Sequence, residues 1–259
     1  MEWGNSDIDA APMTVPRQGG FPSLLAIATI FFTGARLASL QAAAVLTLLI
    51  LLSIAMTFLV SRILTATVLK GEASSFVLEL PPYRRPQIGK VLVRSVFERT
   101  LVVLGRAVMT AAPVNLLIWV MANLRSGGVS LLMYAADLLS PLGWLIGLDG
   151  VLLLAFLLGL PANEIVLPVA VTVYTGAAQL TDYSSLGALQ QILTANGWNI
   201  ATAVCFLVFT LFHWPCATTL LTIRKETGSL RHTVFAFVLP MTVGIVLCAC
   251  LHGLLSVFL

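Results

Sequence analysis

The stretch "GLDGVLLLAFLLGLPANEIVLPVAVTVYTG", Gly147 to Gly176, decides the fold class of this chain. It consists of a short apolar half, a break at Leu160–Glu164 around Pro161, and a second short apolar half. Proline removes a main-chain donor and ends a helix. Main-chain groups freed at bilayer depth are tolerated only where they are buried in protein or line a cavity. The stretch therefore predicts a discontinuous membrane helix.

The composition of the whole chain agrees with a membrane protein. Of its 259 residues, 59% are hydrophobic and only 10% are charged, whereas soluble domains carry about 25% charged residues. Several stretches approach or exceed the roughly 20 apolar residues that cross a bilayer. The four cysteines all lie in apolar sequence, which argues against a disulfide framework. We predict an all-α, polytopic membrane protein with discontinuous (broken) helices.

Other apolar segments predict the remaining spans and their limits. The segment Phe21–Phe32 is too short to cross a bilayer by itself, so it is expected to be re-entrant or partly buried against a partner. Residues 87–100 have apolar residues at helical spacing and predict an amphipathic helix at the interface. Further spans are expected at Leu40–Leu69, Leu101–Ala122, Val129–Leu148 (interrupted at Pro141 and Gly143) and Leu230–Leu259.

The distribution of Lys and Arg predicts the orientation, because cytoplasmic loops carry an excess of these residues. Segments 70–99 and 224–231 are rich in Lys and Arg, so both are expected in the cytoplasm. Segment 123–128, which contains the turn "RSGG", has only Arg125 and is expected outside. The net charge of +3 comes from these flanking residues. No basic face with interleaved aromatics indicates nucleic-acid binding.

A second broken segment, "LFHWPCATTLLTI", breaks at Pro215. Paired interrupted segments point to the midplane site of a transporter. His213 and Cys216 lie three residues apart and share a helical face if the turn stays wound. Imidazole and thiolate suit a borderline transition metal, but a packed cysteine and a core histidine are the alternative. Thr218, Thr219 and Thr222 are expected to form hydrogen bonds between helices.

Glu164 has two interpretations. It follows Pro161 where the second half-helix begins, so it is placed to cap free amides together with Asn163. An intramembrane carboxylate is also a candidate cation ligand. The sequence has no phosphate loop, H-E-x-x-H or G-x-S-x-G motif, so we expect no enzymatic activity from this chain.

Three stretches together resemble the C-terminal membrane half of FeoB, the prokaryotic ferrous iron transporter. They are "KGEASSFVLELPPYRRP", "GLDGVLLLAFLLGLPANEIVLPV" and "LFHWPCATTLLTIRKETGSLRHT". Residues 1–20 are polar and rich in Gly and Pro and are expected to form a disordered tail. The resemblance implies an FeoB-C-like membrane region with a cytoplasmic loop at 21–85, and a second gate domain with a C-terminal transmembrane helix at 86–259. In "FFTGARL", Thr33 stands where the family usually has cysteine.

The resemblance also implies a function. The chain would be a multi-pass subunit in a prokaryotic cell (inner) membrane that moves Fe²⁺, with Cys216 and Glu164 as metal ligands. His213 joins them as a candidate ligand because of its spacing to Cys216. No cofactor would be bound permanently, and GTP would act only through a separate FeoB-like GTPase and first-gate subunit. The lipid bilayer is the other partner, and self-association into a homo-oligomer is left open. The alternatives are a gate-domain (nucleoside-recognition) protein that transports or senses another solute, and a scaffold that transports nothing.

Overall fold

The computed structural model describes residues 21–32, 38–67, 89, 97, 100–177 and 185–258. The expected tail at 1–20, Thr33, most of the basic segment 70–99 and most of the interfacial helix at 87–100 lie outside the described residues. The elements are α2 (Phe21–Phe31), α3 (Ala38–Thr67), α5 (Val102–Asn123), β1 (Arg125–Ser126), β2 (Val129–Ser130), α6 (Leu131–Leu145), α7 (Gly150–Leu158), the 3₁₀ turn η3 (Asn163–Ile165), α8 (Val166–Thr175), α9 (Leu186–Ala195), α10 (Ile200–Phe212), α11 (Ala217–Thr227) and α12 (Leu230–Phe258).

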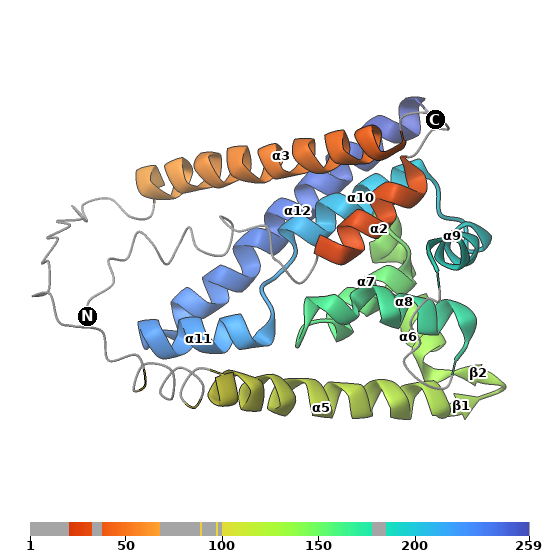
Figure 1. Cartoon of the computed structure of the whole chain (residues 1–259), viewed down its shortest axis with the longest axis horizontal. Helices are drawn as coiled ribbons and strands as arrows, with labels where there is room; N and C mark the ends of the chain where they lie inside the picture. Colours follow the sequence, from red (N-terminus) through yellow and green to blue (C-terminus); the bar gives the residue numbers. More distant parts are fainter. Residues whose placement is uncertain are drawn as a thin grey trace, which may run out of the picture.

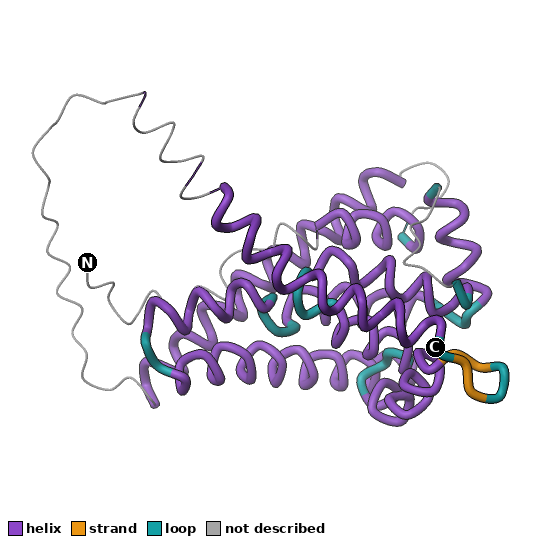
Figure 2. Tube along the Cα trace, turned by 90° about the horizontal axis from the view of Figure 1, so that it is seen from below, coloured by secondary structure: helices purple, strands orange, loops and turns teal. Residues whose placement is uncertain are grey.

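The protein is an all-α membrane protein, as predicted (Figure 2). Three described helical stretches are long and apolar enough to cross a membrane: Leu40–Arg62, Ile200–Lys225 and Leu230–Leu255. In the middle one, which contains the break at Pro215, 61% of the most apolar window is buried, against 17% and 22% in the other two. The broken segment therefore lies inside the bundle, while α3 and α12 present apolar surface outward. The span expected at Leu101–Ala122 forms α5, whose apolar part is Ala111–Asn123.

The fourth apolar segment folds back on itself. Helices α6 and α7 together are apolar enough for a span but meet at an angle of 107°. The expected interruption at Pro141 and Gly143 is wrong, because α6 continues through both residues to Leu145 and the chain turns afterwards. A side chain on Gly143 would begin 2.8 Å from the carbonyl oxygen of Leu148, and one on Gly150 would begin 2.6 Å from the hydroxyl of Ser140. The turn therefore requires glycine at two places where α6 and α7 touch.

A two-residue hairpin joins α5 to α6. Strands β1 and β2 pair antiparallel, with Arg125 opposite Ser130 and Ser126 opposite Val129. Gly127 and Gly128 both have positive φ, 63° and 89°, which is the geometry of a type I′ turn. The "RSGG" turn predicted from sequence is therefore a hairpin. It lies at the opposite end of the long axis from the connection between α11 and α12 (Figure 1).

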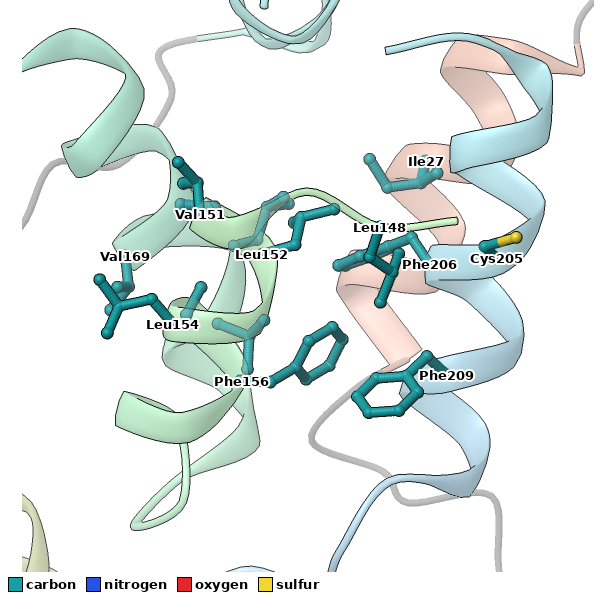
Figure 3. Packing of buried hydrophobic residues seen from close by; sticks show 14 of the residues in the cluster. Ile27, Leu148, Val151, Leu152, Leu154, Phe156, Val169, Cys205, Phe206 and Phe209 are labelled. Atoms are coloured by element: carbon teal, nitrogen blue, oxygen red, sulfur yellow. The ribbon is translucent and has the colours of Figure 1, made fainter. Parts of the chain in front are cut away.

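The core forms where α7 meets α10. The ring centroid of Phe156 lies 4.8 Å from that of Phe209 and 5.6 Å from that of Phe206 (Figure 3). All three side chains are fully buried. Helix α10 also packs along α12, and α2 lies against both α3 and α10. This packing holds the ends of α7 and α10, and hence the two helix breaks, in one region of the protein.

Candidate functional site: the junction of the two helix breaks

The two breaks predicted from sequence touch each other. The first lies between α7 and η3 and contains Pro161, and the second lies between α10 and α11 and contains Pro215. The main-chain amide of Ala217 donates a hydrogen bond of 2.7 Å to the carbonyl oxygen of Leu160. This bond satisfies one carbonyl that the first break frees and one amide at the start of α11. The breaks therefore form a single junction.

Cys216 stands at the N-cap position of α11, immediately before the amide that makes this bond. Its side chain is half-buried, and its Sγ lies 3.1 Å from the hydroxyl oxygens of both Thr218 and Thr219. The hydroxyls of these two threonines were expected to bond to neighbouring helices. They contact the cysteine within their own turn instead, and the hydroxyl of Thr222 donates to the Thr218 carbonyl of its own helix. Sulfur and two hydroxyl oxygens therefore occur together at the start of α11.

His213 is buried at the end of α10, with only 1% of its surface exposed. Its ring lies 5.1 Å from that of Phe156, between centroids, and its Nδ1 lies 2.8 Å from the carbonyl oxygen of Thr210. A carbonyl only accepts, so Nδ1 carries a proton, and in the neutral ring Nε2 then carries the lone pair. The backbone is extended at His213 and at Cys216 (ψ of 173° and 156°). The turn is thus unwound, and the premise that these two residues share a helical face is not met.

Glu164 lies in η3 with its side chain exposed. The N-cap of η3, Ala162, forms no side-chain capping bond. Among the described residues, no side-chain hydrogen bond joins Glu164 or Asn163 to the amides of this turn, so their expected capping role is not seen there. The side-chain oxygen of Asn163 is buried and has no hydrogen-bond donor in the described part of the chain.

The ligands predicted from sequence do not form a preformed metal-binding site. Among the described residues, no group of three or more His, Cys, Asp or Glu side chains is placed to hold a metal ion. The junction offers one thiol, hydroxyl oxygens and main-chain groups instead. Such a mixed set suits a site that an ion passes through, because conduction requires binding weak enough for release.

A second polar cluster escaped the sequence analysis. One carboxylate oxygen of Asp149 accepts from the amide of Leu152 at 2.7 Å and so caps α7. The other accepts from the hydroxyl of Tyr174 at the end of α8, and this hydroxyl accepts in turn from the indole N–H of Trp198 at 2.9 Å. The signal available in sequence was an Asp before an apolar run, which marks an N-cap. Nothing local indicated the tyrosine 25 residues later.

Two known protein families match consecutive segments of the chain. Residues 46–99 match the family described as "Ferrous iron transport protein B C terminus", and residues 104–230 match the Gate family, described as "Nucleoside recognition". A protein named Fe(2+) transporter FeoB from Staphylococcus aureus (strain MSSA476) is 30% identical over 209 residues, which is 77% of this chain and 30% of that protein. Over these two segments the chain is similar to FeoB proteins.

Two further proteins named Fe(2+) transporter FeoB also match part of the chain. The Fe(2+) transporter FeoB of Synechocystis is 27% identical over 217 residues, covering 82% of this chain and 34% of that protein. The one from Leptospira interrogans (serovar Lai) is 26% identical over 211 residues, covering 73% and 30%. The chain thus spans about a third of the length of the curated relatives it matches. No solved structure matches it.

Proposed function

We propose that this chain is the membrane subunit of a ferrous iron transporter, and that Fe²⁺ passes through the junction of the two helix breaks. The observation that carries the proposal is the 2.7 Å bond between Ala217 and Leu160, because it holds Cys216 beside the first break. The relatives named Fe(2+) transporter FeoB support Fe²⁺ as the transported ion. Broken helices that meet within a bundle are the usual setting of transporter sites.

The chemistry of the junction supports a cysteine ligand. Pro215 removes an amide donor and disfavours helical geometry at Trp214, so the backbone opens there. Cys216 is then displayed at the start of α11 with the hydroxyls of Thr218 and Thr219 at 3.1 Å. One thiolate among oxygen donors gives Fe²⁺ a soft, charged ligand without enclosing it. His213, through Nε2, and Glu164, through its carboxylate, are the secondary ligands that we propose.

We also propose that a separate GTPase-bearing chain supplies nucleotide hydrolysis. This sequence contains no phosphate loop of the form G-x-x-x-x-G-K-[ST]. The part of the FeoB relatives that it matches is about a third of their length. A GTPase and a first gate on a partner would complete the transporter in the prokaryotic cell membrane.

The test replaces the chromosomal gene in its own host and measures uptake of radiolabelled Fe²⁺ under reducing conditions. Cys216→Ser and Cys216→Ala should each lower uptake at least tenfold while the membrane abundance of the protein is unchanged. Cys250→Ser is the matched control, because this cysteine is exposed on α12 and belongs to neither helix break, and it should transport normally.

Two results would contradict the proposal in different ways. Wild-type uptake by both Cys216 variants would show that the cysteine only packs, and the ligand assignment would fail. Unchanged Fe²⁺ uptake in a strain that lacks the gene would contradict iron transport as the function. Transport or sensing of another solute, or a scaffold role, would then be the remaining alternatives.

A further inference from the structure

The side-chain oxygen of Asn163 is an unusual atom at the junction. Asn163 is the first residue of η3, two residues after Pro161, and its Oδ1 is buried with no donor among the described residues. Buried polar atoms almost always have a hydrogen-bond partner, and an exception calls for an explanation such as an ion. Leaving a buried acceptor without a donor costs more free energy than a typical hydrogen bond contributes.

The local backbone explains why main-chain donors are scarce here. Proline has no amide hydrogen, so the two residues that break the helices, Pro161 and Pro215, each remove one donor from the junction. The amide of Ala217 is already committed to the carbonyl of Leu160 at 2.7 Å. The same breaks that open the helices therefore reduce the number of N–H groups that can reach an oxygen in this region.

The neighbouring carboxylate does not take this inward position. Glu164 is exposed, whereas Oδ1 of Asn163 is enclosed by the protein. A neutral amide oxygen has a lower desolvation cost than a carboxylate when it is buried. The buried side-chain oxygen of the first break thus belongs to Asn163, which lies three residues beyond the carbonyl that binds Ala217.

We propose that Oδ1 of Asn163 is a ligand for the divalent cation that crosses the junction. Amide oxygens are suitable ligands for hard and borderline divalent ions. A neutral oxygen from the first break would face the ion together with the sulfur of Cys216 from the second, and would hold it weakly enough for release. This inference rests on the proposed function and names an oxygen ligand that the sequence did not.

The test measures the thermal unfolding of the full chain in detergent with and without Mn²⁺, an air-stable probe for Fe²⁺. Asn163→Leu keeps the size of the side chain and removes its polar atoms. Without metal, this variant should unfold at the same or a higher temperature than the wild type, because an unsatisfied acceptor is gone. With metal, the wild type should be stabilised, since ligands that bind only the folded state raise Tm. The apparent Mn²⁺ affinity of the variant should be at least tenfold lower.

Asn196→Leu is the matched control. Asn196 is exposed at the end of α9, where its amide donates to the carbonyl of Ile192 at 2.8 Å. This variant should lose stability without metal but keep the wild-type response to Mn²⁺. Opposite changes in the two asparagine variants separate loss of a ligand from loss of a structural hydrogen bond.

The outcomes distinguish this inference from the function on which it rests. If the wild type responds to Mn²⁺ and Asn163→Leu responds equally, the ligand role of Asn163 is overturned and the proposed function stands. If the wild type does not respond, cation binding by the chain is contradicted and both fail. Should Asn163→Leu not fold, Asn163→Asp replaces it. The added charge should raise the apparent Mn²⁺ affinity at least tenfold, and an unchanged affinity overturns the inference.

Discussion

The hydroxyl of Tyr174 donates a hydrogen bond to the carboxylate of Asp149, and this bond ties the end of α8 to the start of α7. Trp198 extends the tie to the start of α10 through its indole N–H. The indole of Trp198 also stacks on Phe31 of α2, with ring centroids 6.0 Å apart. One polar chain therefore fixes the ends of both broken segments that lie far from the junction.

Replacing Tyr174 tests this tie. Tyr174→Phe leaves one oxygen of the half-buried Asp149 without its donor and removes the acceptor of Trp198. We expect a loss of about 1–3 kcal/mol in the free energy of unfolding, or a Tm lower by roughly 2–4 °C per kcal/mol. Thermal unfolding in detergent, followed by tryptophan fluorescence, measures the change. Tyr134→Phe, at an exposed tyrosine of α6, is the control and should change Tm by much less. Equal shifts would contradict a special role for Tyr174.

Because of the sharp turn between α6 and α7, we expect that Gly150 cannot be replaced by a residue with a side chain without loss of stability. A Cβ there would overlap the carbonyl oxygen of Ala136 and lie 2.6 Å from Ser140 Oγ. Gly150→Ala should therefore separate the two helices and cost about 1–3 kcal/mol or more. Gly187→Ala is the matched control, since nothing lies within 4 Å of a Cβ at that position in α9. It should be neutral or stabilise by up to about 1 kcal/mol. Equal yields and Tm values for the two variants would argue against this packing.

The positions of the connections predict a topology. The α11–α12 connection and the hairpin lie at opposite ends of the long axis (Figure 1). The Lys/Arg bias places Arg224–Lys225 and Arg84–Lys90 in the cytoplasm and Ser126–Gly128 outside. Single cysteines at Gln87, Ser126 and Lys225, in a background without native exposed cysteines, should show it. A reagent that does not cross the membrane should label Ser126→Cys in intact cells and the other two only after lysis. Labelling of Ser126→Cys and Lys225→Cys from the same side would overturn this arrangement.

The proposed partner predicts dependence on a second chain. Purified alone and placed in liposomes, the protein should show no GTP-stimulated Fe²⁺ uptake, because its sequence has no phosphate loop. A tagged copy isolated from its own membranes should carry a GTPase with it, detectable as GTP hydrolysis in the eluate. Robust uptake by the chain alone, independent of GTP, would contradict the partner proposal.

Parts of the candidate site were predictable because their causes are local. Pro161 and Pro215 end helices through the amide that each lacks, and the structure places breaks at both. The same rule fails at Pro113, Pro141 and Pro240, which lie inside continuous helices. Whether a proline breaks a helix depends on whether neighbouring helices, side chains or waters satisfy the groups it frees. That information is not in the local sequence.

The sequence by itself determined the membrane class, the two broken segments and the cysteine that follows the second break. Hydropathy and proline chemistry act over a single turn or span, so they can be read without a fold. Only the tertiary structure decided that Leu160 and Ala217 meet, that Glu164 is exposed while Oδ1 of Asn163 is buried, and that Tyr174 reaches Asp149. These relationships join residues up to 57 positions apart, as in the bond from Ala217 to Leu160. They arise from how α7 packs on α8 and how the ends of α7 and α10 meet, because burial and hydrogen-bond partners are properties of that packing and not of any one segment.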